Sequence, residues 1–342
     1  HPINPLQFGF NIADNIPPTL SKLKIYAFDT TLINGYRKSK IINIKKTNNK
    51  YSIDETPTIN GSFALGISTY DKLNDSYNKN GVYSIKVCVD SSICYKFTVD
   101  ELDFSTSRYI NAHIDYKEKK QSKKKYHRCY KLPHNKLTNY SEIINEGFIN
   151  FNDHIPHLIS LEVTDIYWNI SDLEFNVKSS NNPFLTRCPL PKDTINTPFS
   201  LDKINVFKKE NMELHMESFS LYEPLMFHYN TIDSVDGVYG KVHQVHYNNT
   251  PVHKKYVLSL NAEIADSLKA KSYIATTDLK GNFWHIGGKW TDGFIKTKTR
   301  EFGNFCIITD TINPEIKGVN ISPGKIFNTQ STIKCTIKDN DS

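Results

Sequence analysis

The stretch DNIPPTLSKLKI at residues 14–25 decides the fold that we expect for this chain. It returns near the other end as DTINPEIKGVNI at residues 310–321. Proline lacks a backbone N–H and fixes φ, so Pro17 and Pro18 can neither continue a helix nor sit inside a sheet. Alternating apolar residues follow, which predicts a linker that stops at Pro18 and enters the first, edge strand of a β-sandwich. An internal repeat of this kind indicates a modular chain in which each copy starts a module. The identities at a constant offset are Asp14, Ile16, Pro18 and Ile25 with Asp310, Ile312, Pro314 and Ile321.

The length and composition are those of a globular protein with two or three domains. The chain has 342 residues, of which 38% are hydrophobic and 12% aromatic, so each domain can bury a core. It has no run of eighteen apolar residues, which excludes a helical membrane span, and no signal-peptide pattern at its start. Because it opens with HPINPLQFGF and lacks an initiator Met, we expect it to be a fragment or a mature piece.

The charge pattern does not favour a nucleic-acid partner. The net charge of +6 is modest and spread out, and the abundance of Lys, Asn and Ile is typical of a compositionally biased genome. The one dense basic run has six lysines in the nine residues 117–125. We expect a solvated loop or helix end there, and an electrostatic contact with an acidic envelope polymer is the alternative.

The spacing of apolar residues predicts a mostly β protein made of tandem Ig-like antiparallel β-sandwich modules. Short alternating strands separated by turns place the first module at residues 18–180. Its expected strands are residues 20–28, 40–46, 50–54, 63–70, 82–89, 93–99, 158–164 and 173–178. A partly helical insertion is expected at about 104–150, with short helices at 108–125 and 137–145. Such an insertion usually covers a sheet edge and sometimes binds a partner.

Two further modules are expected after the first. Residues 181–311 form a second β-rich domain, with strands at 256–260, 272–277, 283–286 and 304–308 and a short helix at 262–271. Residues 312–342 begin a third Ig-like module, which is incomplete because it has only an entry strand and a strand at 332–338. Two or three strands rarely hold together alone. This end is therefore expected either to pack on the second module or to continue in a longer chain.

Six cysteines are scattered with neither CxxC nor zinc-ribbon spacing. Cys88 and Cys94 flank the turn 90–92 of an expected hairpin and lie on its polar face, close to opposite each other. Because disulfide geometry is narrow, a cross-strand disulfide and two ordinary thiols both remain open. Cys335 alternates with isoleucines and is expected to be a buried small hydrophobe.

The best histidine cluster is His243, His246 and His253. A catalytic zinc takes three protein ligands, but residues three apart on a strand point to opposite faces. The neighbouring residues favour a strand, so we expect surface histidines in a hairpin. His154 and His157 bracket a proline and receive the same interpretation.

Trp284 and Trp290 flank the glycine pair at 287–288. Core packing is the ordinary role of a tryptophan in a strand. The alternative is a contact with a glycan or a partner, because exposed aromatic rings on a β-sandwich can stack on sugars. Trp168 shares this ambiguity. The glycine pair lacks the spacing of a phosphate-binding loop, and no GxSxG motif occurs.

Asp71 and Asp165 lie at the ends of expected strands, next to loops where Ca²⁺ can bind in Ig-like repeats. No run of alternating acidic ligands accompanies them. Turn capping is therefore the favoured interpretation of both residues, and a calcium site is the alternative.

Several separate motifs resemble one family. They are Asn-Pro-Leu-x-Phe-Gly-Phe at residues 4–10, Asn-Lys-Asn-Gly-Val-Tyr-Ser-Ile at 78–85, RYINAHIDY at 108–116, Glu-Phe-Gly at 301–303, and the repeat that starts at Asp310. Together they resemble the segment after the catalytic domain in a group of Bacteroidota lysostaphin/LytM-type zinc metallopeptidases. The similarity covers essentially the whole chain.

This resemblance implies that the parent is a peptidoglycan endopeptidase and that the present chain is its non-catalytic accessory region. The HxxxD and HxH zinc motifs of the family do not occur in this sequence. Residues 1–17 are then a linker that follows an absent catalytic domain. Zinc is expected only in that domain, so no catalytic residue, metal ligand or cofactor is expected in this chain.

The resemblance also implies a periplasmic, envelope or secreted location. The expected partners are the chain's own upstream peptidase domain and either peptidoglycan or an envelope protein, with no nucleic acid. The alternative of another class is a stand-alone Ig-like adhesin or carbohydrate-binding module that uses Trp284 and Trp290. An enzyme with its own active site in this chain is a third hypothesis.

Overall fold

The computed structural model describes residues 12–28, 31–151, 153–180, 195–233, 236–326 and 332–339. The protein is mostly β and is built from several antiparallel sheets, which confirms the predicted fold class. It divides into two compact units. The first comprises His1–Asp193, Leu221–Glu223 and Asn249–His253, and the second comprises Thr194–Ser220, Pro224–Asn248 and Lys254–Ser342.

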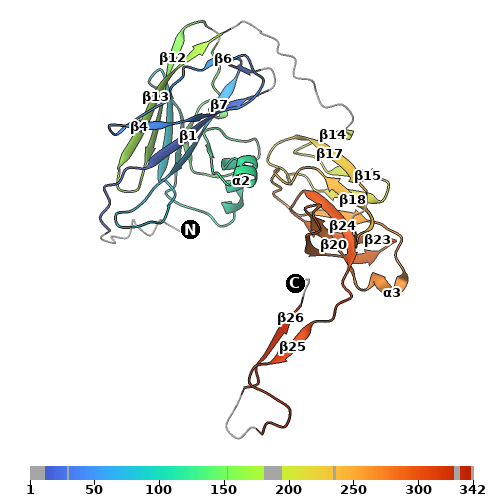
Figure 1. The fold of residues 1–342 in the computed structure, drawn as a ribbon. Coiled ribbons are helices and arrows are strands. Elements are labelled where there is room, and N and C mark those ends of the chain that lie inside the picture. Colours follow the sequence, from blue (N-terminus) through green and yellow to red (C-terminus); the bar gives the residue numbers. More distant parts are fainter. Residues whose placement is uncertain are drawn as a thin grey trace. The chain divides into compact units, whose positions relative to one another are not determined.

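The first unit contains two sheets (Figure 1). The smaller has the order β10-β7-β1-β3, formed by His127–Arg128, Phe63–Tyr70, Thr19–Ala27 and Lys40–Asn43. The larger has the order β11-β9-β8-β12-β13-β5-β4, formed by Tyr140–Ile143, Ser92–Thr98, Ser84–Val89, Pro156–Thr164, Ile170–Ser179, Lys50–Ser52 and Lys45–Thr47. Off this path, β6 (Thr58–Asn60) pairs with β13 and with β2 (Leu32–Ile33). The pairings of β13 with β5 and β6 are parallel, and the other described pairings are antiparallel.

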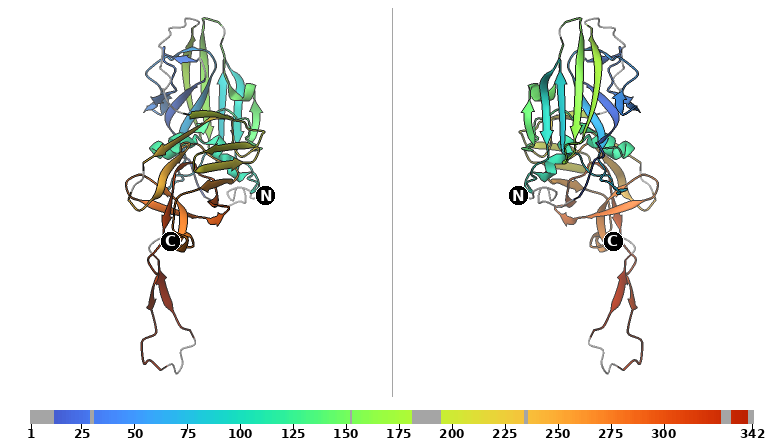
Figure 2. Two further views of the ribbon diagram at one scale, coloured as in Figure 1. Left: turned by 90° about the vertical axis from the view of Figure 1, so that its right-hand side faces the viewer. Right: turned by 90° about the vertical axis from the view of Figure 1, so that its left-hand side faces the viewer.

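One continuous core joins the two sheets of the first unit. It includes Leu23 of β1, Ile67 of β7 and Leu161 of β12, each with no measurable exposure. The predicted alternation along β12 and β13 is confirmed, since Leu173, Phe175 and Val177 are buried while Glu174 and Asn176 between them are exposed. Because neighbouring residues of a strand point to opposite faces, this pattern fixes which face of the sheet is inside. Figure 2 shows the long strands of the larger sheet side by side.

The prediction that residues after Pro18 form an edge strand is wrong. Strand β1 pairs with β3 on one side and with β7 on the other, so it lies inside its sheet. The strand begins at Thr19, after both prolines, so every residue within it keeps the N–H that a two-sided ladder needs.

The insertion is partly helical, as expected at its start. It contains the 3₁₀ turn η2 (Ser107–Tyr109) and the helices α1 (Ile110–His113) and α2 (Tyr116–Ser122). Asp115 caps α2 by accepting a hydrogen bond from the Glu118 N–H at 3.1 Å. After another 3₁₀ turn, η3 (Asn145–Gly147), the chain returns to β12.

The second helix predicted in the insertion, at residues 137–145, is wrong. The chain there forms β11, which pairs with the open edge of β9. The Tyr140 ring also packs edge-on against Phe97 of β9, with the ring centroids 5.1 Å apart. Pairing with a partner strand therefore overrides a weak local preference for helix.

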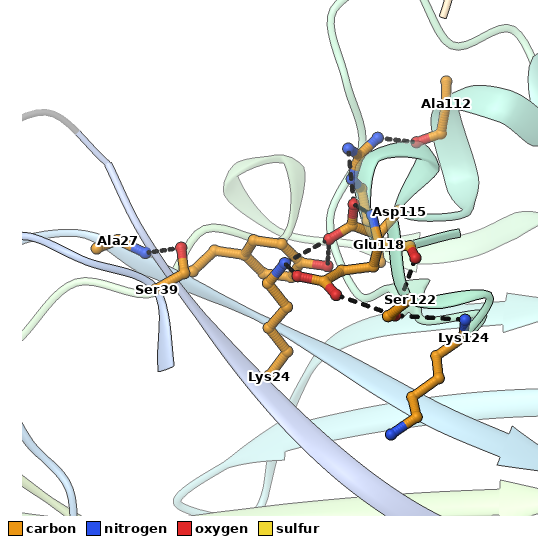
Figure 3. A network of polar contacts seen from close by, with 10 residues as sticks. Lys24, Ala27, Ser39, Ala112, Asp115, Glu118, Ser122 and Lys124 are labelled. Atoms are coloured by element: carbon orange, nitrogen blue, oxygen red, sulfur yellow. Dashed lines mark hydrogen bonds and ion pairs between the residues drawn. The ribbon is translucent and has the colours of Figure 1, made fainter. Parts of the chain in front are cut away.

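A buried ionic network ties the insertion to β1 (Figure 3). The Lys24 ammonium lies 2.7 Å from Asp115 Oδ2 and 2.9 Å from Glu118 Oε1. The Tyr26 hydroxyl donates to the same Asp115 oxygen at 2.8 Å. Arg128 donates to the Ala112 carbonyl at 3.0 Å. These contacts hold α1 and α2 on the outside of the smaller sheet.

The second unit contains two large antiparallel sheets and a two-stranded one described below. One has the order β14-β17-β18-β24-β20-β21, formed by Ile195–Phe199, Leu225–Ile232, Tyr239–Val245, Gly303–Thr309, Ser272–Thr277 and Phe283–Gly287. The other has the order β15-β16-β19-β23-β22, formed by Asn205–Lys209, Met212–Met216, Tyr256–Leu260, Phe294–Thr299 and Lys289–Thr291. The helix expected at 262–271 is only α3 (Asp266–Lys269), and Ala265 at its start makes no side-chain capping hydrogen bond.

The last described strands, β25 (Glu315–Gly318) and β26 (Cys335–Lys338), form a two-stranded hairpin. All their residues are exposed, so the prediction that Cys335 is buried is wrong. Alternation buries a residue only where a second layer covers that face.

The two copies of the internal repeat share their local structure. Asp14 accepts a hydrogen bond from the Ile16 N–H at 3.1 Å, and Asp310 accepts one from the Ile312 N–H at 3.0 Å. Strands β1 and β25 also begin at the same position of the repeat. The repeat therefore encodes an aspartate-capped turn that leads into a strand.

Candidate functional site

The first unit has a cavity of about 440 Å³, partly open to solvent, next to the insertion. Its walls are largely apolar, and a few polar side chains from separate segments reach it. The lining includes Val82, Phe97, Leu102, Ile110, His113 and His127. A concave, mainly apolar site with a few converging polar groups is the usual form of a small-ligand pocket.

A series of hydrogen-bonded polar groups reaches the wall of the cavity at His113 and His127. Asn135 Nδ2 donates to the Tyr140 hydroxyl at 2.7 Å, and that hydroxyl lies 3.1 Å from His113 Nδ1. His113 Nε2 lies 2.9 Å from His127 Nδ1, and the His113 ring stacks on Phe97 with centroids 3.9 Å apart. Helix α1 and strands β10 and β11 supply these groups, so the insertion is what assembles them.

His113 and His127 are both held in the neutral form. Burial, with help from His127 and Arg128, keeps the pKa of His113 well below its ordinary value. Burial and then Lys125 lower the pKa of His127 to about 4. A neutral imidazole donates from one nitrogen and accepts at the other. Both ring nitrogens of His113 are taken by Tyr140 and His127, so the pair rigidifies this part of the first unit and offers no imidazolium charge at neutral pH.

Three carboxylates lie close together in the first unit, and one of them lines the cavity. Asp71 follows β7 and lines the cavity, Asp165 follows β12, and Asp14 belongs to the segment before β1. One oxygen of each lies within 4.8 Å of the others. Burial, together with the charges of Asp165 and Asp14, raises the pKa of Asp71 to about 6. Burial and Asp14 also raise the pKa of Asp165.

The three carboxylates differ in their hydrogen bonds. Asp165 Oδ1 accepts from the N–H groups of Tyr167 and Asn169, both at 2.8 Å, and its Oδ2 accepts from Asn169 Nδ2 at 2.7 Å. Asp165 thus performs the turn capping that was the favoured interpretation. Asp71 Oδ1 and Asp14 Oδ2 are buried and have no hydrogen-bond partner among the described residues.

Sequence reasoning singled out Asp71 and Asp165 but missed Asp14 as their neighbour. The three residues lie far apart along the chain, so no spacing motif could join them. The one available signal was that Asp14 opens the internal repeat next to the strand that enters the sheet.

Both tryptophans of the predicted glycan contact lie in the second unit, in different sheets. Trp284 is on β21 and is 54% exposed. Trp290 is on β22 and is partly buried, and its Nε1 donates to Ser272 Oγ at 2.7 Å. Trp284 is therefore the residue of the pair that offers a ring to solvent. Trp168, in the first unit, is 71% exposed and packs edge-on against Tyr83.

Cys88 and Cys94 are free thiols in the structure, so the disulfide alternative is not formed. A bulge between Val87 and Cys88 shifts the register, which places Cys88 opposite Ile93. Cys94 packs against the core, and burial followed by the charge of Cys88 raises the pKa of its thiol to about 11. The expectation that both lie on a polar face is wrong because the bulge changes the alternation.

The histidines expected on the surface are largely buried, and no metal-binding group of described residues contains them. In the second unit, His243 Nδ1 lies 2.9 Å from the Tyr229 hydroxyl, and His246 Nδ1 accepts from the His228 N–H at 3.1 Å. His246 follows β18 with a φ of 53°, a bend that strand periodicity cannot anticipate. His253 belongs to the first unit, where it stacks on Tyr109.

His157 is also buried, on β12, where a turn was predicted. Its Nδ1 lies 2.6 Å from Asp90 Oδ2 and its Nε2 lies 2.8 Å from Asp153 Oδ1. The ring stacks on Phe151 with centroids 3.6 Å apart. Through Asp90, these contacts join β12 to the turn between β8 and β9. The other predicted residue of this pair, His154, is exposed.

The basic run at 117–125 covers α2 and the turn after it, and its lysines are largely exposed. Lys123 ends the helix in a left-handed conformation with a φ of 59°. This agrees with the predicted solvated helix end.

Among the described residues, none of the helices has both the length and the apolar character needed to span a bilayer.

Comparison with known proteins gives one match. Residues 196–310 match a family described as a Zu5-like domain, and most of them belong to the second unit. Neither the curated proteins nor the solved structures contain a match to the chain. The second unit is thus similar, over these residues, to a Zu5-like domain.

Proposed function

We propose that this chain is the non-catalytic accessory β region of a cell-envelope peptidoglycan zinc metalloendopeptidase. In this role it positions or regulates the peptidase domain or docks it to a partner. The observation that carries the proposal is the buried network of Lys24, Asp115 and Glu118, which fixes the insertion on the sheet. The family in this proposal comes from the motif resemblance. The role as a rigid support comes from the buried network.

The buried network of Lys24, Asp115 and Glu118 carries an energetic cost. Moving a lysine and an aspartate out of water is unfavourable, and apolar residues of similar size would often stabilise the fold more. Lys24 and Asp115 are nevertheless only 6% and 2% exposed. A network of this kind fixes one arrangement of the groups it joins. Here that arrangement holds the insertion, with the polar groups around His113 beside the cavity, in one fixed position on the smaller sheet.

In this proposal the zinc belongs to the peptidase domain of the parent. The partners of this chain are that domain and either peptidoglycan or an envelope protein, and its location is the periplasm, the envelope or the outside of the cell. A direct test is the coding sequence upstream of His1. HxxxD and HxH motifs there would support the proposal, and a signal peptide placed directly before His1 would contradict it.

A second test is binding of the purified chain to the purified peptidase domain of the parent. We expect a complex that is weakened when Lys24→Met loosens the insertion. The matched control is Lys45→Met, whose ion pair with Asp54 is exposed. Equal binding by both variants would show that the anchoring of the insertion plays no part in docking.

A second candidate function is carbohydrate binding by a stand-alone adhesin or module, and the exposed ring of Trp284 favours it. Its test is co-sedimentation of the chain with purified sacculi. This function requires that Trp284→Ala and Trp290→Ala each lose binding. Trp168→Ala, an exposed tryptophan of the first unit, is the control. Unchanged binding by the first two variants rules this function out.

A further inference from the structure

Three carboxylates from three separate segments converge in the first unit, at Asp14, Asp71 and Asp165. We propose that they form a calcium site. The inference concerns the first unit alone and stands independently of the peptidase proposal.

The strongest evidence for a ligand is the Asp71 side chain. It is only 5% exposed, and its Oδ1 has no hydrogen-bond partner among the described residues. Asp14 Oδ2 is likewise buried without a partner in the described part of the chain. A buried carboxylate oxygen left unpaired is costly, and native structures usually satisfy such atoms with a donor, a water or an ion.

Among the described residues, no Lys, Arg or His forms an ion pair with Asp14, Asp71 or Asp165. Asn169 and nearby backbone N–H groups satisfy Asp165 but bring no charge. Like charges in one site repel, so a bound divalent cation would stabilise all three carboxylates together.

The ligand type of the site favours calcium, and the spacing of its oxygens is compatible with it. Calcium binds oxygen at about 2.3–2.6 Å, so two of its ligands on opposite sides lie about 4.6–5.2 Å apart. The three carboxylate oxygens lie within 4.8 Å of one another, which fits this limit. Magnesium requires closer ligands in near-ideal octahedral geometry. Zinc prefers His and Cys, which this cluster does not contain. Asp14 is only partly buried, so water can complete the coordination.

A bound ion would fasten the segment before β1 to the sandwich. Asn169 Nδ2 already links this segment to the loop after β12, since it donates to the Asp14 carbonyl at 3.2 Å and to Asp165 Oδ2 at 2.7 Å. Calcium would add the end of β7 through Asp71. The ion would thus set the direction in which the chain enters the first strand.

The test uses the whole chain, freed of metal with a chelator and dialysed at about pH 7.5. Calorimetric titration with CaCl₂ is expected to show one saturable site, with a Kd of about 10⁻⁴–10⁻³ M as in extracellular calcium modules. The thermal unfolding midpoint is expected to rise with CaCl₂, because a ligand that binds only the folded state stabilises it. MgCl₂ at the same concentration should give a smaller rise. An equal rise with magnesium would overturn the assignment to calcium.

The decisive variant is Asp71→Asn, which removes one charge at nearly constant shape. We expect calcium affinity to fall at least about tenfold. We also expect the metal-free variant to unfold at the same or a higher temperature than the parent, because repulsion in the cluster is relieved. Asp172→Asn is the control, since Asp172 faces solvent on β13.

Asp14→Asn provides a second variant at a less buried position, in case Asp71→Asn fails to fold. Its calcium affinity is expected to fall in the same way. The proposal is overturned if the parent shows neither a heat signal nor a rise in its unfolding midpoint with CaCl₂. It is also overturned if the folded variants bind calcium as tightly as the parent does.

Discussion

The Lys24 ammonium lies 2.7 Å from Asp115 Oδ2, and the two side chains are only 8% and 3% exposed. One residue belongs to a strand of the smaller sheet and the other caps helix α2 of the insertion. This pair is therefore the point at which the insertion is anchored to the first unit.

Replacing Lys24 with Met should destabilise the first unit by about 3 kcal/mol, because Asp115 would stay buried after losing its closest cation. Denaturant unfolding measures this difference. Lys45→Met is the matched control, since its ion pair with Asp54 is exposed and should contribute less than about 1 kcal/mol. Equal losses in the two variants would show that the buried pair is not a structural anchor.

Gly147→Ala should destabilise the first unit by at least about 2 kcal/mol. Gly147 has a φ of +83°, and a Cβ atom there would lie 2.5 Å from the Cys129 carbonyl oxygen and 2.7 Å from the Tyr130 Cα. Both obstacles are backbone atoms, which cannot move aside cheaply. Gly81→Ala has nothing within 4 Å of the new Cβ and should change the thermal midpoint little. A midpoint for Gly147→Ala that matches the parent would contradict this packing.

Leu161→Ala and Leu158→Ala test the register of β12. Leu161 is completely buried, so its truncation should cost about 2–5 kcal/mol, whereas Leu158 is 39% exposed and should cost far less. The free energy of unfolding from denaturant titration distinguishes them. The reverse order of effects would mean that the strand turns its other face to the core.

The contacts of His157 predict a pH dependence. Burial alone would lower its pKa, but the hydrogen bonds to Asp90 and Asp153 outweigh burial and raise it. A histidine whose pKa is higher in the folded state stabilises the fold below its unfolded pKa of about 6.5. That contribution is lost as the pH rises through the folded pKa. The same hydrogen bond lowers the pKa of Asp90, so its contribution disappears only in stronger acid.

Asp90→Asn should therefore lower the thermal midpoint more at about pH 6 than at about pH 8.5. His154→Gln, at an exposed histidine close in sequence, should show no such difference. A loss for Asp90→Asn that is the same at both values would mean that His157 is not charged in the folded protein near pH 6.

The fold was largely predictable because its strands carry a strict period of two. Strand β7 was predicted at its exact bounds, and most of β12 and β13 was predicted from alternation alone. Strand β11 was missed because its conformation depends on the open edge of β9 rather than on its own residues. The position of β1 inside its sheet depends on which strands flank it, and local sequence does not record that.

The candidate sites were less predictable. The cluster of Asp14, Asp71 and Asp165 needs three loops that only the folded sheets bring together. The pairing of His113 with His127 could not be predicted either, because it depends on burial and on the cavity beside the two residues. The bulge at Cys88 and the bend at His246 each break the alternation on which sequence reasoning relies.

Release of soluble fragments from purified sacculi is the most direct test of the central proposal. The account predicts that the isolated chain releases none, with or without added Zn²⁺. It also predicts that the parent protein, carrying an upstream domain with HxxxD and HxH motifs, releases fragments in a chelator-sensitive reaction. Chelator-sensitive release by the isolated chain would contradict the account.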